Sequence, residues 1–254
     1  MVEGKVYLVG TGPGDPELIT IKGLRVMREA DVVIYDRLVT EALIKLIPER
    51  VEKIYVGKRT GWHTIPQGEI HRIMIERARS GRVVVRLKGG DPFLFGRGGE
   101  EAQELKKAGV RFEVVPGVTS ALAAPAYAGI PVTHREYSSS VAIVTGHEDP
   151  GKEQGFVDLE KLATTVDTIV VLMGVGRLKE IVGELIRGGR NGQTDVAVIE
   201  WGATGRQRTI TGTLDDIVGK AAVHRISPPA VIVVGEVVRL HRALHWFEGE
   251  RRCH

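Results

Sequence analysis

The chain has 254 residues, carries 35 Lys and Arg against 32 Asp and Glu for a formal net charge of +3, and is 43% hydrophobic. This ordinary globular composition excludes a collagen-like chain, a coiled coil and a disulfide-rich scaffold. The longest apolar runs, such as residues 168–173 and 230–234, fall far short of the ~20 residues that a membrane-spanning helix needs. At roughly 150 residues a domain, the length predicts one large α/β domain or two compact ones.

Cysteine usage and the start of the chain indicate a compartment. The single cysteine, Cys253, has no partner for an internal disulfide. Charges appear already at Glu3 and Lys5, and no apolar segment with a small-residue cleavage site follows them. We therefore expect a cytoplasmic protein that does not associate with a membrane.

The first half of the chain alternates short runs of Val and Ile with amphipathic segments. The pattern predicts strands at residues 6–10, 32–35, 53–56, 83–88 and 112–115, and helices at 18–30, 67–80 and 99–108. Because the strands are apolar on both faces, we expect a parallel sheet covered on each side by helices.

The residue pattern changes around residues 130–140, where an Ile-Pro-Val-Thr-His-Arg turn precedes a polar run. We therefore place a domain boundary between residues 136 and 137. The second domain, 137–254, is predicted to contain strands at 141–145, 168–173, 196–200, 208–213 and 230–238, and helices at 175–187 and 214–223. We expect the strands at 208–213 and 230–238 to be neighbours in a mixed sheet.

A glycine-rich turn, residues 10–15, follows the first strand. The dinucleotide fingerprint needs a third glycine where Asp15 stands, which disfavours a nicotinamide-dependent dehydrogenase. Pro13 has no N–H to offer a phosphate, and Asp15 would repel one. Nor do residues 57–59 form a nucleotide-binding P-loop, because Arg59 replaces its Ser or Thr. The turn at 10–15 fits a ligand without phosphates, or a strand-to-helix connection that binds nothing.

Two more loops follow predicted strands. Residues 86–101 contain five glycines after the strand, which lets a ligand lie close to the backbone. Within them, Asp91 could accept a hydrogen bond from a ribose or simply form a turn before Pro92. Residues 116–121 offer Thr119 or Ser120 as a helix cap. The three strand ends are expected to form one edge of the sheet, where open α/β folds bind ligands.

Taken together, these segments resemble the tetrapyrrole methylases. The resemblance includes the loop 10–15, Tyr-Asp-Arg-Leu-Val at 35–39, Val-Gly-Lys-Arg at 56–59, the loop 89–101, residues 116–121 and Ala-Gly-Ile-Pro-Val-Thr-His-Arg at 128–135. It continues through residues 173–175, 206–208 and 230–240, and so covers almost the whole chain.

The resemblance implies two α/β domains of the tetrapyrrole methylase type with a cofactor cleft between them, and a homodimer. It implies that S-adenosyl-L-methionine methylates uroporphyrinogen III at two ring carbons, C2 and C7, giving precorrin-2 for sirohaem and cobalamin biosynthesis and leaving S-adenosyl-L-homocysteine. It implies neither a metal nor a nucleic-acid partner.

The family pattern also implies residue roles. The cofactor would be bound by Pro13, Gly89, Gly90, Asp91, Leu94, Thr119, Ser120, Met173, Gly202 and Ala230. Where the family commonly has Asn, this chain has Trp201, beside the retained Gly202.

Methylation of a pyrrole carbon needs alignment of donor and acceptor and then a base that removes a proton. Asp36 is the candidate base, or else a structural ion-pair partner of Arg37 or a helix cap. Lys58 is the candidate proton donor or carboxylate-binding cation, or else an exposed surface lysine. The substrate's eight carboxylates call for guanidinium groups. The candidates are Arg37, Arg59, Arg97 and Arg135.

Among the histidines, His241 and His245 are four residues apart but lack the metalloprotease glutamate, so no metal site is expected there. His63 and His71 are expected in a loop at the protein surface or the substrate rim.

Alternative functions remain open from the residues. One is a later precorrin methylase of the cobalamin pathway with the same fold, and another is a relative that acts on ribosomal RNA, which the lack of a basic tract disfavours. From a different class, the chain could bind S-adenosylmethionine without catalysis.

Overall fold

The computed structural model describes residues 4–57, 65–147 and 157–248. The chain divides into two compact units, Met1–Thr119 and Ser120–His254, so the division precedes the expected boundary at 136/137. The difference arises from the helix α5 (Ser120–Tyr127), which packs against strands β7 (Thr168–Leu172) and β10 (Ala230–Val234) of the second unit.

The first unit is built around a parallel five-stranded sheet of order β3-β2-β4-β1-β5. Its strands are β1 (Lys5–Gly10), β2 (Val32–Tyr35), β3 (Glu52–Tyr55), β4 (Val83–Lys88) and β5 (Arg111–Val115), each within one residue of its prediction. The central strands β1, β2 and β4 are mostly buried on both faces, as their composition predicted, whereas the edge strands β3 and β5 are mostly half-buried.

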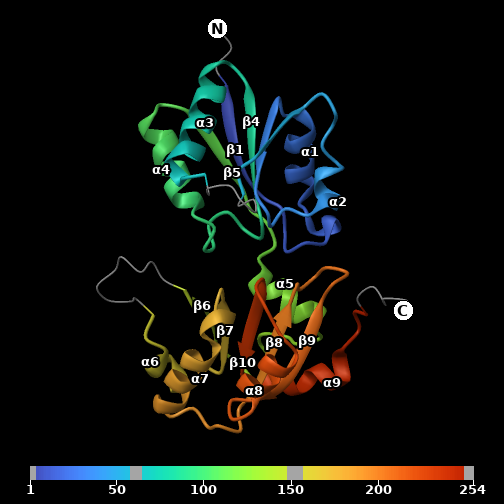
Figure 1. Ribbon diagram of the computed structural model, residues 1–254, viewed down its shortest axis with the longest axis vertical. Coiled ribbons are helices and arrows are strands. Elements are labelled where there is room, and N and C mark those ends of the chain that lie inside the picture. Colours follow the sequence, from blue (N-terminus) through green and yellow to red (C-terminus); the bar gives the residue numbers. More distant parts are fainter. Residues whose placement is uncertain (1–3, 58–64, 148–156, 249–254) are drawn as a thin grey trace. The chain divides into compact units, whose positions relative to one another are not determined.

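Helices cover both faces of this sheet (Figure 1). On one face α1 (Ile21–Glu29) and the short α2 (Glu41–Ile44) enclose a core that includes Met27 and Leu43. On the other, α3 (Gln67–Arg79) and α4 (Gly98–Lys107) enclose a second core around Met74 and Leu105. The prediction of a parallel sheet covered on each side by helices is confirmed.

The helix predicted at 18–30 is shorter than expected. A 3₁₀ turn, Pro16–Leu18, comes first, and Thr20 then accepts a hydrogen bond from the Gly23 N–H at 3.0 Å. This capping fixes the start of α1 because it satisfies an N–H that has no partner within the helix.

The second unit contains a mixed sheet of order β6-β7-β10-β8-β9. The remaining strands are β6 (Val141–Thr145), β8 (Asp195–Glu200) and β9 (Arg208–Thr213). Strands β6 and β7 are parallel, whereas β10 runs antiparallel to both β7 and β8. The mixed sheet is confirmed, but the expected pairing of 208–213 with 230–238 is wrong, because β8 lies between them.

Strand β10 also ends earlier than predicted, at Val234. Gly235 has a φ of 148°, a conformation that favours glycine, and the chain then turns into a 3₁₀ helix, Glu236–Leu240. The apolar residues Val237 and Val238 are buried in this helix rather than in the strand.

One face of the second sheet is covered by α6 (Leu159–Thr165), α7 (Leu178–Arg187) and α8 (Ile217–Val223), which share one apolar core with it. Helix α7 is preceded by a 3₁₀ turn, Val175–Arg177, and α8 begins three residues later than the predicted 214. A short α9 (His241–Leu244) follows the 3₁₀ helix near the end of the described chain.

The core of the second unit gives a stability prediction. Leu185 is fully buried on α7, whereas its neighbour Ile186 is 41% exposed. Leu185→Ala should lower the free energy of unfolding by about 2–5 kcal/mol, since it removes packed methyl groups and leaves a cavity. Ile186→Ala is the matched control and should cost much less. Urea denaturation of both variants measures the difference, and equal losses would contradict the assigned packing.

Candidate functional site

The three predicted loops meet at the carboxyl edge of the first sheet. The backbones of Gly12 and Gly90 pair directly, with the Gly90 N–H donating to the Gly12 carbonyl at 2.7 Å. Because β4 and β5 both lie beside β1, the loops that follow these strands are neighbours. The expectation that the three strand ends form one edge is confirmed.

Close backbone approach explains two of the glycines at this edge. Gly90 has a φ of 67°, in the left-handed region that favours glycine. A Cβ on Gly117 would lie 2.3 Å from the Gly90 carbonyl oxygen, inside van der Waals contact. Substitution at Gly117 would therefore push the second and third loops apart.

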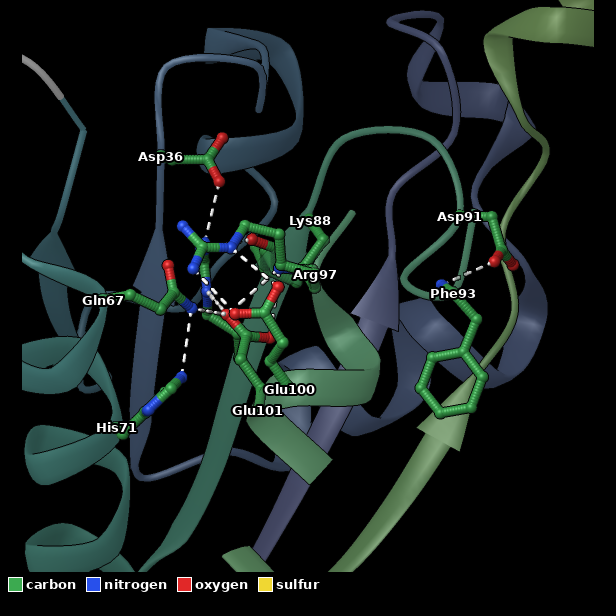
Figure 2. Close-up of polar contacts among 11 residues, drawn as sticks. Asp36, Gln67, His71, Lys88, Asp91, Phe93, Arg97, Glu100 and Glu101 are labelled. Carbon is green, nitrogen blue, oxygen red and sulfur yellow. Dashed lines mark hydrogen bonds and ion pairs between the residues drawn. The ribbon is translucent and has the colours of Figure 1, made fainter. Parts of the chain in front are cut away.

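Asp91 ties the same two loops together. One carboxylate oxygen accepts from the Phe93 N–H at 2.8 Å and the Leu94 N–H at 3.2 Å, and the other accepts from the Gly117 N–H at 3.0 Å. The turn interpretation of Asp91 thus holds, and its carboxylate also links the 89–101 loop to the 116–121 loop. Figure 2 shows Asp91 and Phe93 on this loop, apart from the charged cluster.

Asp36 follows β2, at the same edge of the first sheet. Its Oδ1 accepts from the Leu38 N–H at 3.0 Å, which fixes a turn, and its Oδ2 pairs with the Arg86 guanidinium at 2.9 Å. The structural alternative that paired Asp36 with Arg37 therefore names the wrong partner. Arg37 is exposed and makes no ion pair with any residue that the structure describes.

Beneath Asp36 lies a cluster of buried charges to which sequence analysis assigned no role. Arg86 and Lys88 on β4 and Glu101 on α4 are at most 5% exposed. The Glu101 Oε1 accepts from Arg86 Nε at 3.3 Å, Lys88 Nζ at 3.1 Å and the Gln67 amide at 3.1 Å. Figure 2 shows Asp36, Lys88, Gln67 and Glu101 gathered in this cluster.

The strand pattern contained the signal for this cluster. Arg86 and Lys88 are two residues apart, so they point to the same face of β4, the face that packs on α3 and α4. Burial lowers the pKa of the Lys88 ammonium, and the neighbouring Arg86 charge lowers it further. The Glu101 carboxylate raises this pKa, but the net shift is downward. Two cations on a buried face require a buried anion, which Glu101 on α4 supplies.

In the second unit, three of the predicted cofactor residues gather at one edge of the mixed sheet. Met173 follows β7, Gly202 lies just beyond β8, and Ala230 begins β10. Because β10 is antiparallel to both neighbours, its first residue pairs with Glu200 at the end of β8. Met173 is 53% exposed and has a φ of 56°.

Glu200 holds this edge together. One carboxylate oxygen accepts from the Ser227 N–H at 2.8 Å and its hydroxyl at 3.0 Å, and the other accepts from Arg208 Nε at 2.6 Å. Burial raises the pKa of Glu200, but the Ser227 and Arg208 contacts outweigh it and the net pKa is lowered. The carboxylate therefore joins the loop after β8 to the segment that leads into β10.

Trp201, the position for which the sequence resemblance implies Asn, adopts a φ of 51°. Asn tolerates this left-handed conformation better than other residues with a Cβ. Here the Trp201 N–H donates to the Pro229 carbonyl at 3.0 Å, and the Arg206 guanidinium stacks 3.6 Å from the centre of the indole ring. These contacts hold Trp201 in a conformation that its side chain does not favour.

The remaining predicted residues are distributed more widely. Pro13, Gly89 and Leu94 lie in the edge loops of the first unit, and Gly89 packs so closely on Leu38 that a Cβ would lie 2.7 Å from that residue's Cβ. Thr119 ends the first unit and Ser120 begins α5 in the second. Lys58 and Arg59 lie outside the described residues.

Of the other substrate candidates, Arg97 is exposed and pairs with Glu100 at 2.7 Å. Arg135 is exposed too, in a tight turn closed by reciprocal backbone hydrogen bonds between His134 and Ser138. This turn belongs to the second unit, whereas Arg37 and Arg97 belong to the first.

His71 lies on α3 rather than in a loop, and its Nε2 is 3.2 Å from the Gln67 amide nitrogen. The expected loop placement is wrong for His71, while His63 is outside the described residues. In the described ranges no group of three or more His, Cys, Asp or Glu side chains is placed to hold a metal ion. The helices of the same ranges include none long and apolar enough to cross a membrane.

The Glu200 contacts predict a pH-dependent stability. A carboxylate whose folded pKa lies below its unfolded value, near 4.5, stabilises the fold above that pH and loses this contribution as the pH falls through the folded value. Glu200→Gln should lower the unfolding free energy by about 1–3 kcal/mol at pH 7, and the difference from the unsubstituted chain should shrink below pH 4.5. Glu180→Gln, exposed on α7, is the control. Denaturation across the range from about pH 3 to neutrality measures both, and a constant difference would refute the assignment.

Comparison with known proteins places the chain in a family. The model of the Tetrapyrrole (Corrin/Porphyrin) Methylases matches residues 5–218. The chain is 56% identical over 238 residues to a uroporphyrinogen-III C-methyltransferase of Methanocaldococcus jannaschii, covering 93% of this chain and 98% of that protein. It is 49% identical to a sirohaem synthase of Pseudomonas putida, covering 98% of this chain and 53% of the longer protein.

A solved structure is also similar. The uroporphyrin-III C-methyltransferase of Thermus thermophilus, crystallised in complex with S-adenosylhomocysteine, superposes with a TM-score of 0.80 at 46% identity, over 93% of this chain and 94% of that one. The resemblance of the sequence motifs to this family is thus confirmed over nearly the full length. The chain belongs to the tetrapyrrole methylases.

Proposed function

We propose that this chain transfers methyl groups from S-adenosyl-L-methionine to C2 and C7 of uroporphyrinogen III, giving precorrin-2. The observation that carries the proposal is the 56% identity, over almost the whole of both chains, to a uroporphyrinogen-III C-methyltransferase. The loop chemistry supports it independently, since Pro13 and Asp15 suit a ligand without phosphates.

The residues at the first edge fit S-adenosylmethionine. Gly90 and Gly117 let the loop backbones approach one another, and the N–H groups of these two residues donate to Gly12 and Asp91, so a ligand at this edge would meet loops of fixed shape. S-adenosylmethionine supplies an electrophilic methyl group on a sulfonium. Asp91 already accepts three backbone hydrogen bonds, so we assign it first to holding the loops in shape and second to contacting the ribose.

Asp36 is the proposed base. After methylation the macrocycle is cationic and must lose a proton, which a carboxylate at the sheet edge can accept. Leu38 and Arg86 hold one oxygen each of this carboxylate, so its orientation is fixed before substrate arrives. Lys58, which comes shortly after β3 in the chain, is the proposed second acid–base group or carboxylate-binding cation.

Substrate carboxylates are proposed to pair with Arg37, Arg59, Arg97 and Arg135. Exposed Arg37 follows Asp36 directly, which suits a carboxylate beside the reacting ring. Arg97 would have to exchange its contact with Glu100 for the substrate, at little cost because that pair is exposed. Met173, Gly202 and Ala230 are proposed to contact the cofactor's adenosyl part.

We further propose that the chain acts in the cytoplasm as a homodimer and that its product serves sirohaem or cobalamin synthesis. The likeness to a sirohaem synthase supports the first pathway. Size-exclusion chromatography with light scattering tests the dimer, and a monomeric mass across the working concentration range would overturn it.

The activity is tested by anaerobic incubation with S-adenosylmethionine and uroporphyrinogen III, followed by mass analysis of the tetrapyrrole. A gain of two methyl groups is expected. No gain, with S-adenosylhomocysteine still bound, would refute the proposed substrate and leave a methyltransferase for a different tetrapyrrole.

The proposed base gives a mutational prediction. Asp36→Asn keeps the shape of the side chain but removes its basicity, so turnover should fall by roughly 100-fold or more while S-adenosylhomocysteine binding is unchanged. Glu41→Gln, which neutralises an exposed carboxylate on α2, is the control and should retain full turnover. Turnover of Asp36→Asn close to that of the control would exclude Asp36 as the base.

A further inference from the structure

The buried charges beneath Asp36 call for an explanation beyond stability. Glu101 is fully buried, and Arg86 and Lys88 are nearly so. Removing such groups from water is costly, and replacement by packed apolar residues is often neutral or stabilising. The rest of this core is made mostly of Val, Ile, Leu and Met side chains. Apolar side chains would therefore fill this part of the core at a lower desolvation cost than the charged cluster does.

Hydrogen bonds fix the Arg86 guanidinium on three sides. Its Nε donates to Glu101 at 3.3 Å, its Nη1 to the Leu87 carbonyl at 2.8 Å and its Nη2 to Asp36 at 2.9 Å. Glu101 is held in turn by Lys88 and by the Gln67 amide, each at 3.1 Å from Oε1. The orientation of Arg86 is thus set by a buried anion that Asp36 itself does not touch.

We propose that Glu101 is a positioning residue for methyl transfer: through Arg86 it fixes the orientation and the electrostatic surroundings of the Asp36 carboxylate. The inference rests on the proposed role of Asp36 as the base. Glu101 lies in the first turn of α4 and is fully buried, so its side chain has no exposed atom to offer a substrate, and it acts on the reaction through the guanidinium.

Charged groups on several elements lie near Asp36 and bear on the pH dependence of kcat. The cations Arg86 and Lys88 lie on β4, and the anion Glu101 lies on α4. His71 on α3 contacts Gln67, whose amide donates to Glu101. Exposed Arg37 adjoins Asp36 along the chain. Glu101 offsets the two buried cations and raises the pKa of Lys88 against burial and the Arg86 charge, so its neutralisation changes the charge that surrounds Asp36.

The test compares Glu101→Gln with Glu100→Gln. Glu100 is the adjacent residue on α4, is exposed and pairs with exposed Arg97, so its neutralisation leaves the hydrogen bonds of the buried cluster in place and removes only a through-space interaction with Lys88 and His71. Arg97 is a proposed substrate contact, so the control is judged on kcat and pH profile at saturating substrate. Folding of each variant is checked first by thermal unfolding and by S-adenosylhomocysteine binding.

Glu101→Gln should lower kcat by roughly 10- to 100-fold, because a displaced base loses alignment. KM for both substrates should stay within about twofold, and the acidic limb of the kcat–pH profile should move from its position in the unsubstituted enzyme. Glu100→Gln should show none of these changes. A wild-type kcat and an unmoved acidic limb in folded Glu101→Gln would overturn the proposal.

A second variant keeps the inference testable if Glu101→Gln does not fold. Arg86→Lys retains the charge but cannot reach Glu101, Leu87 and Asp36 together, because an ammonium lacks the planar fork of a guanidinium. We expect a comparable fall in kcat with little movement of the acidic limb. Full kcat in Arg86→Lys would overturn the proposal.

Different results would refute the positioning role of Glu101 and the proposed role of Asp36 on which it rests. If Asp36→Asn retains turnover, the assignment of the base is wrong whatever the Glu101 variant does. If Asp36→Asn is inactive while Glu101→Gln and Arg86→Lys both match the unsubstituted enzyme, the base stands and only the positioning role is lost.

Discussion

The close approach of three backbones at the carboxyl edge of the first sheet is the constraint on which the candidate site depends. Gly12 pairs with Gly90, and Gly117 lies against the Gly90 carbonyl with no room for a Cβ. Asp91 then fastens the second and third loops by accepting hydrogen bonds from both. Glycine permits the close approach, and the hydrogen bonds of the Asp91 carboxylate fix the second and third loops relative to each other.

The charged cluster extends this arrangement into the core. Asp36 receives one hydrogen bond from its own turn and one from Arg86, which in turn donates to buried Glu101. A base held by exposed partners would sample several orientations, whereas this one is supported by groups that packing already immobilises. Removing Arg86 and Glu101 from water costs free energy, and in return the Asp36 carboxylate is oriented before the substrate binds.

Sequence patterns predicted the first unit well because a parallel sheet of apolar strands is a local signal repeated five times. They failed where distant residues decide the outcome. The position of β8 between β9 and β10 depends on antiparallel pairing across the unit, and the end of β10 depends on Gly235. Asp36 was found from its place after a strand, but its partner Arg86 lies 50 residues further along the chain. Periodicity within one segment cannot reveal such a pair.

Unfavourable backbone conformations in the second unit gather at the edge that carries the predicted cofactor residues. Met173, Trp201 and Ala203 all have positive φ, which costs residues with a Cβ on the order of 1–3 kcal/mol each. Such conformations persist only where surrounding contacts impose them. Here Glu200 ties the loop to Ser227, and Arg206 covers the indole of Trp201. Trp201 thus keeps a left-handed backbone conformation because its N–H is held by Pro229 and its indole ring by Arg206.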